Sequence, residues 1–191
     1  SRISYPGVLG TGVAKLPGGL NVGRTGLTET AAKAEGMDIV SAVSVVDDKA
    51  HYYPGAGSFL VKLVAEKASH KLLGIQVLGT GAVDKMTDIA VTAISLGASV
   101  EQLASMDFAY APPFSTAIHP IAHAVNILLN KMNGEMDSFS PAQYQEGEAE
   151  GYRIVDCAMQ PSLPNHPYLD LVKIKGEQEG YKKDEKLLLV C

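Results

Sequence analysis

The sequence predicts an α+β fold, in which strands and helices form separate blocks along the chain. Two hairpin-like pairs of apolar segments lie within residues 8–25 and 58–78. The hydrophobic spacing then changes to a helical period between residues 83 and 131. A block of strands followed by a block of helices favours a sheet that carries helices on its surface.

The strand block is predicted to consist of antiparallel neighbours joined by polar turns. Residues 8–16 and 20–25 are separated by the turn Pro17-Gly18-Gly19. Within residues 58–66 the side chains alternate, so Phe59, Val61 and Leu63 should share one face of the sheet. The other expected strands are residues 39–46 and 71–78.

Four segments carry helix signals. Residues 28–35 form the first, because Thr28 can cap its start and Gly36 can end it. Pro112 and Pro113 exclude a helix from residues 110–115, which must form a shaped loop. The other three predicted helices are residues 83–96, with Val83, Met86, Ile89, Ala93 and Leu96 at helical spacing, residues 100–106 and residues 116–131.

The last third of the chain is predicted to be a separate small α/β unit that is incomplete. Residues 135–151 are polar and acidic, so they are expected to form a linker. We therefore predict a domain over residues 1–134, a linker over 135–151 and a partial domain over 152–191. Three strand-like segments are expected in this partial domain, at residues 152–157, 168–174 and 186–191.

Composition excludes several classes of protein. Hydrophobic residues make up 46% of the chain and charged residues 19%, which argues against disorder. The net charge is −5 with no basic stripe, so nucleic acid is an unexpected partner. Apolar runs are too short for a membrane span, and the two cysteines predict a reducing compartment, by default the cytoplasm. The abrupt start leads us to expect a domain cut from a longer protein.

One family is indicated by four motifs taken in order: NVGRTGLTETAAKAEG, DDKAHYYPG, LLGIQVLGTGAVDKMTDIAVTAISLGASVEQL and FAYAPPFS. Together they resemble the C-terminal domain of the pyridine nucleotide–disulfide oxidoreductases, in the branch of coenzyme A–disulfide reductase and NADH oxidase. The resemblance covers roughly the first two-thirds of the chain. It implies a mixed, mainly antiparallel sheet flanked by helices, and a two-fold homodimer in which each copy completes the active site of the other.

The resemblance also implies where the cofactors bind. In this family the FAD domain, the NAD(P)H domain and the redox cysteine precede the dimerisation domain, so the present chain is expected to bind neither cofactor and to be inactive alone. The glycines Gly7, Gly10 and Gly12 begin a predicted strand, whereas a dinucleotide turn ends a strand before a helix. No His, Cys and Asp cluster has metal-ligand spacing.

Two tyrosines are the candidate catalytic residues. In coenzyme A–disulfide reductases two tyrosines of this domain reach the partner's redox cysteine, and by motif they match Tyr52 and Tyr110. A phenol is protonated at neutral pH and can donate a hydrogen bond to a departing thiolate. The loop residues expected at the active site and the dimer interface are Ala111, Pro112, Pro113 and Phe114. The alternative is that both tyrosines are amphipathic interface residues; Tyr53 is the neighbour that could replace Tyr52.

Other polar residues are interpreted as structural. Glutathione-reductase-like relatives pair a His-Pro motif with a glutamate five residues after the histidine, but here that position is Ala124. His119 is therefore predicted to be a residue of a helix N-terminus, inside the helix of residues 116–131, rather than an acid or base. His51 is expected on a loop surface, although it could touch a nucleotide or phosphate. Asp84 and Asp88 could act as paired carboxylates, but a solvated helix face is favoured.

The tail resembles part of a rhodanese domain, which some coenzyme A–disulfide reductases carry. In such domains a cysteine at the end of a strand carries sulfur, and Cys191 matches that position. The activating loop would lie beyond it, and the usual Asp-x-Arg is replaced by Asp156-Cys157-Ala158. An ordinary strand-end cysteine is therefore an equal alternative, and Cys157 is predicted to be a small buried residue.

The resemblance implies a parent enzyme that uses FAD and NAD(P)H to reduce coenzyme A disulfide or persulfide. One alternative is an NADH oxidase or peroxidase, in which oxygen or peroxide is the electron acceptor. The other is a free-standing, non-enzymatic dimerisation module.

Overall fold

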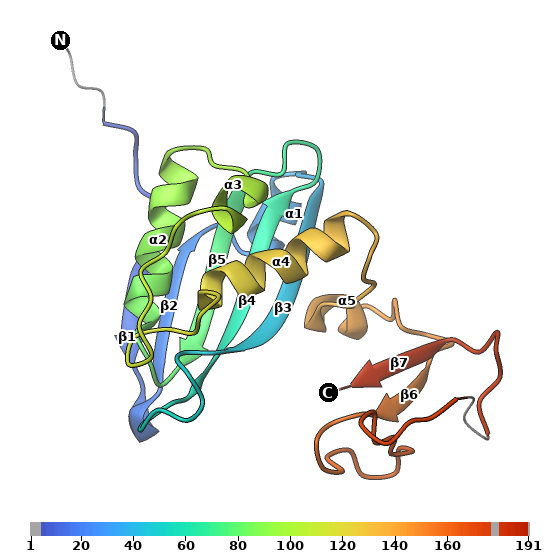
Figure 1. Ribbon diagram of the computed structural model, residues 1–191. Coiled ribbons are helices and arrows are strands. Elements are labelled where there is room, and N and C mark those ends of the chain that lie inside the picture. The colour runs from blue at the N-terminus through green and yellow to red at the C-terminus, as the bar shows by residue number, and fades with distance from the viewer. Residues whose placement is uncertain (1–4, 177–179, 191) are drawn as a thin grey trace. The chain divides into compact units, whose positions relative to one another are not determined.

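The computed structural model describes residues 5–176 and 180–190. The chain divides into two compact units, residues 1–140 and residues 141–191. Among the described residues, unit 1 contains a five-stranded sheet and four α-helices, whereas unit 2 contains a two-stranded sheet and one short helix (Figure 1). The α+β class predicted from the sequence is confirmed.

The sheet of unit 1 is antiparallel throughout, with the strand order β1-β2-β5-β4-β3. Its longest pairing joins β3 to β4 over nine residues, from Ile39 opposite Glu66 to Asp47 opposite Ser58. The predicted strand 8–16 is shorter in the structure, because only Gly12–Lys15 pairs with β2. The strands are β1 (Gly12–Lys15), β2 (Asn21–Gly26), β3 (Ile39–Asp47), β4 (Ser58–Glu66) and β5 (Leu72–Gly79).

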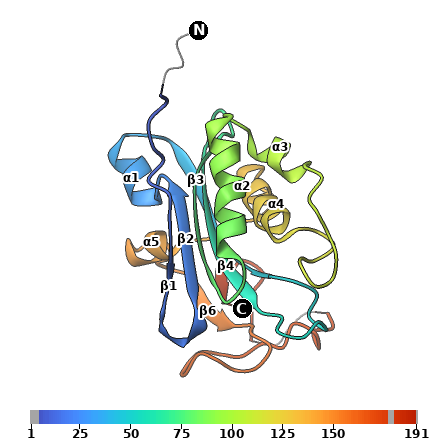
Figure 2. The same cartoon turned by 90° about the vertical axis from the view of Figure 1, so that its left-hand side faces the viewer.

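Helices cover the two faces of this sheet unequally. Figure 2 shows α2, α3 and α4 together on one side of the sheet and α1 on the other. A 3-10 turn, Pro17–Gly19, joins β1 to β2 as the sequence predicts. The helices are α1 (Glu29–Ala34), α2 (Val83–Ser95), α3 (Val100–Ala104) and α4 (Pro120–Met132).

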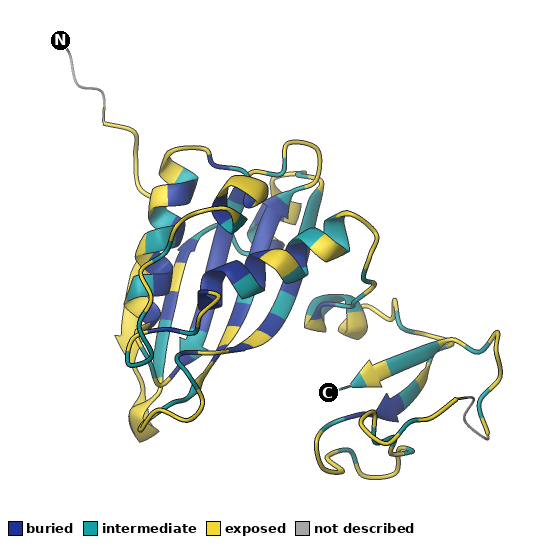
Figure 3. Ribbon diagram, in the orientation of Figure 1, coloured by how far each residue is buried: buried dark blue, intermediate teal, exposed yellow. Residues whose placement is uncertain are grey.

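The core lies between the sheet and the helices α2 to α4. The predicted alternation in β4 is confirmed, since Phe59, Val61 and Leu63 are all buried on this face (Figure 3). They pack against apolar residues of α2 and α4, among them Met86 and Ile121, which are fully buried. Burial of such side chains is the main force that holds helices on a sheet.

Local signals place several helix ends correctly. The Thr28 hydroxyl accepts a hydrogen bond from the Ala31 backbone N–H at 3.1 Å, which caps α1 as predicted. Gly36 and Gly97 follow α1 and α2 with φ of +73° and +65°, the left-handed conformation that commonly ends a helix. Ser99 and Gln102 form a reciprocal capping box at the start of α3.

Two helix predictions are wrong in detail. The helix predicted over residues 116–131 begins only at Pro120, because the chain stays extended at His119, which serves as the N-cap. Proline at the first helical position needs no intrahelical N–H partner, so it fixes this start. The helix predicted over residues 83–96 ends at Ser95, and Leu96, its C-cap, is 78% exposed.

Unit 2 consists of α5 (Pro141–Gln145), β6 (Arg153–Asp156) and β7 (Leu187–Val190), with β6 and β7 parallel. The strand predicted over residues 168–174 is reduced to a single bridge between Tyr168 and Asp156. Asp156 is fully buried, and backbone N–H groups of Leu163, Ser162 and Ala158 lower its pKa to about 2. Cys157 is buried as expected, while Cys191 lies outside the described residues.

Candidate functional site

The loops that carry the two candidate tyrosines leave the same end of the unit 1 sheet. β3 ends at Asp47, directly opposite the first residue of β4, and the loop with Tyr52 connects them. β5 ends at this edge as well, since Gly79 pairs with Phe59, and α2 starts just beyond it. Lys85 in the first turn of α2 contacts the Tyr110 loop, so both loops lie at the lower end of the sheet in Figure 1.

The Tyr52 loop, residues 48–57, is closed tightly at its base. The Asp48 N–H donates to the Gly57 carbonyl at 2.9 Å, and the Gly57 N–H donates to Asp48 Oδ1 at 2.8 Å. Asp48 is only 6% exposed, whereas Tyr52 at the tip is 68% exposed. His51 is exposed and meets the Tyr52 ring edge-on at a centroid distance of 5.5 Å. The loop therefore presents an aromatic tip on a fixed base.

The Tyr110 loop, residues 105–119, contains neither helix nor strand. Backbone N–H groups of Phe114 and Ser115 both donate to the Ala111 carbonyl, at 2.8 and 3.1 Å. Tyr110 is 50% exposed and Phe114 is 73% exposed. Pro112 and Pro113 are half-buried within this turn. An exposed aromatic group on a constrained loop is typical of a surface that contacts a ligand or another chain.

His119 does not have the environment of an acid–base residue. Its Nδ1 accepts a hydrogen bond from the Ile121 backbone N–H at 3.2 Å, so this nitrogen carries no proton. Burial, and then the positive charge of Lys85, lower the His119 pKa to about 4. Ala124, five residues later, is buried and offers no carboxylate. The position is a helix N-cap, as predicted, although outside the helix rather than within it.

The Tyr110 loop also contains a polar group that the sequence did not single out. Ser115 is fully buried, and its Oγ lacks a hydrogen-bond partner among the described residues. A buried hydroxyl without a partner costs about 1–3 kcal/mol, so such groups are rare in folded proteins. Sequence patterns could not reveal it, because the burial of Ser115 depends on the path of the whole loop.

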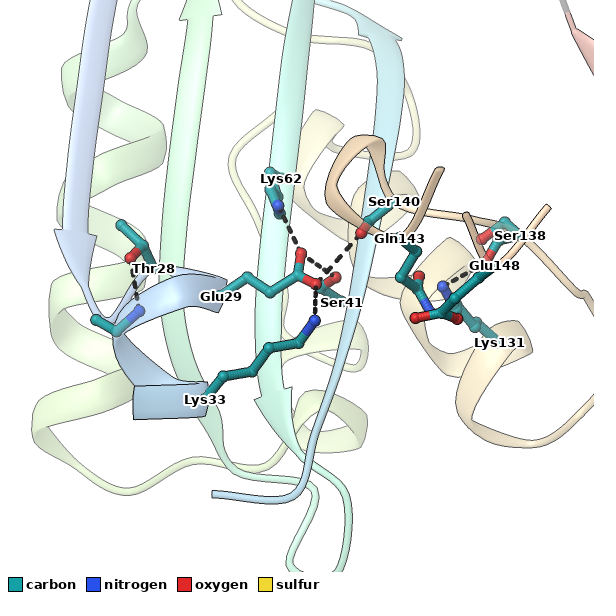
Figure 4. Close-up of polar contacts among 11 residues, drawn as sticks. Thr28, Glu29, Lys33, Ser41, Lys62, Lys131, Ser138, Ser140, Gln143 and Glu148 are labelled. Carbon is teal, nitrogen blue, oxygen red and sulfur yellow. Dashed lines mark hydrogen bonds and ion pairs between the residues drawn. The ribbon is translucent and has the colours of Figure 1, made fainter. Parts of the chain in front are cut away.

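A second polar cluster surrounds Ser41 on β3. Ser41 is six residues before Asp47, so the cluster lies about 20 Å from the tyrosine end. Glu29 on α1 is 4% exposed and accepts hydrogen bonds from Ser41 at 3.0 Å and Ser140 at 3.2 Å (Figure 4). Lys62 and Lys33 approach its carboxylate at 2.7 and 3.1 Å. Burial alone raises the Glu29 pKa, but Lys62, Lys33 and Ser41 outweigh it and lower the pKa to about 2. Such a saturated carboxylate is a structural group.

The remaining sequence candidates lie apart from the tyrosine loops or are solvated. Asp84 and Asp88 are exposed on α2, which matches the solvated face that was favoured. Within residues 5–176 and 180–190, no three His, Cys, Asp or Glu side chains are grouped as metal ligands. A search of the same residues finds no helix that is both long and apolar enough to span a bilayer.

Comparison with known proteins decides the family. Residues 18–122, more than half of the chain, match the pyridine nucleotide-disulphide oxidoreductase dimerisation domain. The chain belongs to this oxidoreductase family. The matched residues include both tyrosine loops, Lys85 and His119, so the reductase dimerisation domain is the part of the chain that carries the candidate site.

Relatives of this dimerisation domain are longer proteins. The NAD(P)H sulfur oxidoreductase (CoA-dependent) of Pyrococcus furiosus is 36% identical over 127 residues, which are 66% of this chain and 28% of the relative. The NADH oxidase of Methanocaldococcus jannaschii is 34% identical over 131 residues, which are 69% of this chain and 29% of the relative. The chain therefore spans less than a third of the length of the curated relatives it matches.

The likeness extends to three-dimensional structure. A NAD-dependent persulfide reductase from A. fulgidus aligns with a TM-score of 0.86 and 29% identity. The alignment covers the whole of this chain and 35% of that structure. Unit 2 therefore has a counterpart in a solved protein, although the family match itself ends at residue 122.

The family is FAD- and NAD(P)H-dependent, and the glycines near β1 do not have the strand–turn–helix position of a dinucleotide turn. Gly7 and Gly10 precede β1 instead of following a strand. Gly79 ends β5 and Gly81 lies between β5 and α2, but packing explains both glycines. A Cβ on Gly79 would meet the Ser58 carbonyl at 2.5 Å, and one on Gly81 would meet Asp48 Oδ2 at 2.6 Å.

Proposed function

We propose that this chain is the C-terminal dimerisation part of an FAD-dependent, NAD(P)H-driven reductase of coenzyme A disulfide or persulfide. The proposal rests on one observation: Tyr52 and Tyr110 are both exposed, and each lies on a constrained loop at the same end of the sheet. In a homodimer this end would face the active site of the partner subunit. The names of the Pyrococcus furiosus and A. fulgidus relatives support the substrate class.

The chemistry suits a phenol. Two-electron reduction of an S–S bond breaks the bond and releases a thiolate, which gains stability from a hydrogen-bond donor and then takes up a proton. Tyr52 and Tyr110 would donate to that sulfur from the other subunit, while the redox cysteine and the cofactors would come from residues outside this chain. Both side chains are exposed here, so their hydroxyl groups are accessible to an incoming partner.

The test replaces Tyr110 with Phe in the full-length enzyme. We expect turnover of coenzyme A disulfide to fall about tenfold or more, because a phenylalanine ring packs alike but donates nothing to the thiolate. Sedimentation should still show a dimer. Tyr144→Phe is the matched control, since Tyr144 in α5 is 50% exposed like Tyr110 but lies outside both tyrosine loops. Unchanged turnover in Tyr110→Phe would remove the catalytic assignment.

A second candidate function is supported by the relative from Methanocaldococcus jannaschii, which is named an NADH oxidase. Its acceptor would be oxygen or peroxide, and the tyrosines would then serve only the interface. Steady-state assays of the full-length enzyme with coenzyme A disulfide and with oxygen separate the two functions. Faster oxygen consumption that is insensitive to Tyr110→Phe would favour the oxidase. If the gene proves to encode no flavin domain, the chain would be a dimerisation module without activity.

We also propose that unit 2 takes part in sulfur transfer, as a rhodanese-like domain of the reductase. Cys191 is its candidate carrier, and this residue lies outside the described residues. Its role stays a prediction, which Cys191→Ser tests through the persulfide formed on the full-length enzyme.

A further inference from the structure

A pair of aromatic rings joins the first part of the Tyr110 loop to its last residue. Phe108 comes two residues before Tyr110, and His119 ends the loop as the N-cap of α4. Their ring centroids are 4.6 Å apart with an interplanar angle of 31°. His119 is 6% exposed, so this contact is held inside the protein. The pair closes residues 109–118 into a loop with fixed ends.

Lys85 attaches the middle of the same loop to α2. Its Nζ donates a hydrogen bond to the Phe114 carbonyl at 3.2 Å. The Phe114 N–H donates in turn to the Ala111 carbonyl at 2.8 Å, so both backbone polar groups of Phe114 are engaged. A hydrogen bond from an ammonium group is stronger than one between neutral groups. The segment that follows Tyr110 is therefore held by a tie to the helix in addition to its own turn.

We infer that Lys85 and the Phe108–His119 pair are positioning residues, which fix the backbone that presents Tyr110. They act through the loop and need not touch the substrate. His119 can serve in this way because it is neutral at pH 7, which lets its ring lie near Lys85 without charge repulsion. The kinetic part of the inference rests on the proposed function, whereas the part about loop shape rests on the contacts alone.

Hydrogen exchange of the chain itself tests the loop shape. Lys85→Met removes the ammonium group but keeps an unbranched side chain of similar length. We expect exchange at the Phe114 and Ser115 amides to rise about five- to tenfold, because opening of the loop becomes easier. Lys85→Arg should restore protection, since it keeps a donor. Lys67→Met is the matched control, because Lys67 is exposed in the β4–β5 turn at the other end of the sheet. Unchanged exchange in Lys85→Met would overturn the inference.

His119→Asn separates the ring contact from the helix cap. Asparagine is a good N-cap residue, so the Ile121 amide should stay protected. Loss of the imidazole removes the contact with Phe108, so protection of the Phe114 and Ser115 amides should fall as in Lys85→Met. If the Ile121 amide loses protection while the loop amides keep theirs, His119 serves α4 alone, and its part of the inference fails.

A double-mutant cycle in the full-length enzyme tests whether the positioning acts through Tyr110. Lys85→Met should lower turnover of coenzyme A disulfide in the parent, but should have little further effect in Tyr110→Phe. A merely structural role would lower turnover equally in both backgrounds, which would overturn the inference. If Tyr110→Phe alone changes nothing, the proposed function fails. The exchange data then still decide whether Lys85 and His119 hold the loop.

Discussion

Polar groups near the start of strand β3 are buried and paired, whereas aromatic groups near its end are exposed to solvent. Near its start, Ser41 belongs to a cluster in which one carboxylate, that of Glu29, is buried and surrounded by two lysines and two serines. Beyond its last residue, the loops expose Tyr52, Tyr110 and Phe114, which are 68%, 50% and 73% exposed. The same strand thus connects a region with satisfied charges to a region with uncovered rings.

This difference separates stability from recognition. A buried charge is tolerated only when partners replace the water that it has lost, so the Glu29 cluster holds the fold together but has little left to offer a ligand. Exposed aromatic groups gain nothing from folding and become useful only when another molecule covers them. Substitutions at the Glu29 end should change stability, and substitutions at the tyrosine end should change contacts.

The largest effect is expected from Glu29→Gln. The amide cannot balance Lys33 and Lys62, so the free energy of unfolding of the chain should fall by about 2–3 kcal/mol. Chemical denaturation followed by circular dichroism measures this change. Asp88→Asn, at an exposed position on α2, is the control and should change stability by less than about 0.5 kcal/mol. Equal effects of the two variants would contradict the comparison.

Acid should destabilise the two ends in different pH windows. The Glu29 pKa is about 2 in the folded chain, below its ordinary 4.5, so its contribution is present above pH 4.5 and is lost as the pH falls towards 2. The His119 pKa is about 4, below its ordinary 6.5, so the unfolded state takes up this proton first and stability is lost between pH 6.5 and 4.

In each of these two pH windows, the free energy of unfolding should fall by at most about 2–3 kcal/mol per titrating group. Unfolding curves recorded from pH 7 to pH 2 should therefore show two descending limbs. Glu29→Gln should reduce the lower limb, to which the Asp156 carboxyl with its pKa of about 2 also contributes, and His119→Asn should remove the upper limb. A variant that abolishes both limbs would show that the two ends are not independent.

A smaller effect is expected at the base of the Tyr52 loop. Asp48→Ala removes the acceptor of the Gly57 N–H, and we expect a loss of about 1–2 kcal/mol. Proteolysis within residues 49–56 should become faster, because the loop opens more often. Asp47→Ala, on the exposed neighbour, provides the comparison. If cleavage in the loop is equally fast in both variants, Asp48 does not hold its base.

The smallest effect is expected from Ser115→Ala. Removing a buried hydroxyl that lacks a partner among the described residues should leave stability unchanged or raise it by about 1 kcal/mol. Thermal unfolding of the chain measures this shift. A loss of stability would mean that the Ser115 Oγ is satisfied in solution, for example by a bound water molecule.

Local chemistry made much of unit 1 predictable. Alternation in residues 58–66 and the cap at Thr28 depend on neighbouring residues alone, and both are confirmed. The start of α4 was misplaced because helical spacing of apolar residues continues upstream of Pro120, while the backbone there is not helical. The end of α2 was placed one residue too late, at Leu96, since periodicity does not show where a helix has stopped.

Contacts between distant segments were not predictable. Lys85 reaches Phe114 across 29 residues of sequence, and Glu29 meets Ser140 across 111 residues. No local pattern marks such pairs, because each residue alone is an ordinary polar side chain. The candidate tyrosines came from motif resemblance, and their catalytic role stays a prediction. The predicted strand 168–174 failed because apolar residues there pair with β6 at only one point.

The bond between Ser140 and Glu29 has a consequence for the order of assembly during protein synthesis. Glu29 leaves the ribosome early, and Ser41 and Lys62 soon follow, but the second serine arrives only after the whole of α4. A nascent chain that stops short of residue 140 therefore carries a carboxylate with one ligand missing. The peptide that leads into unit 2 is thus also the final piece that completes unit 1.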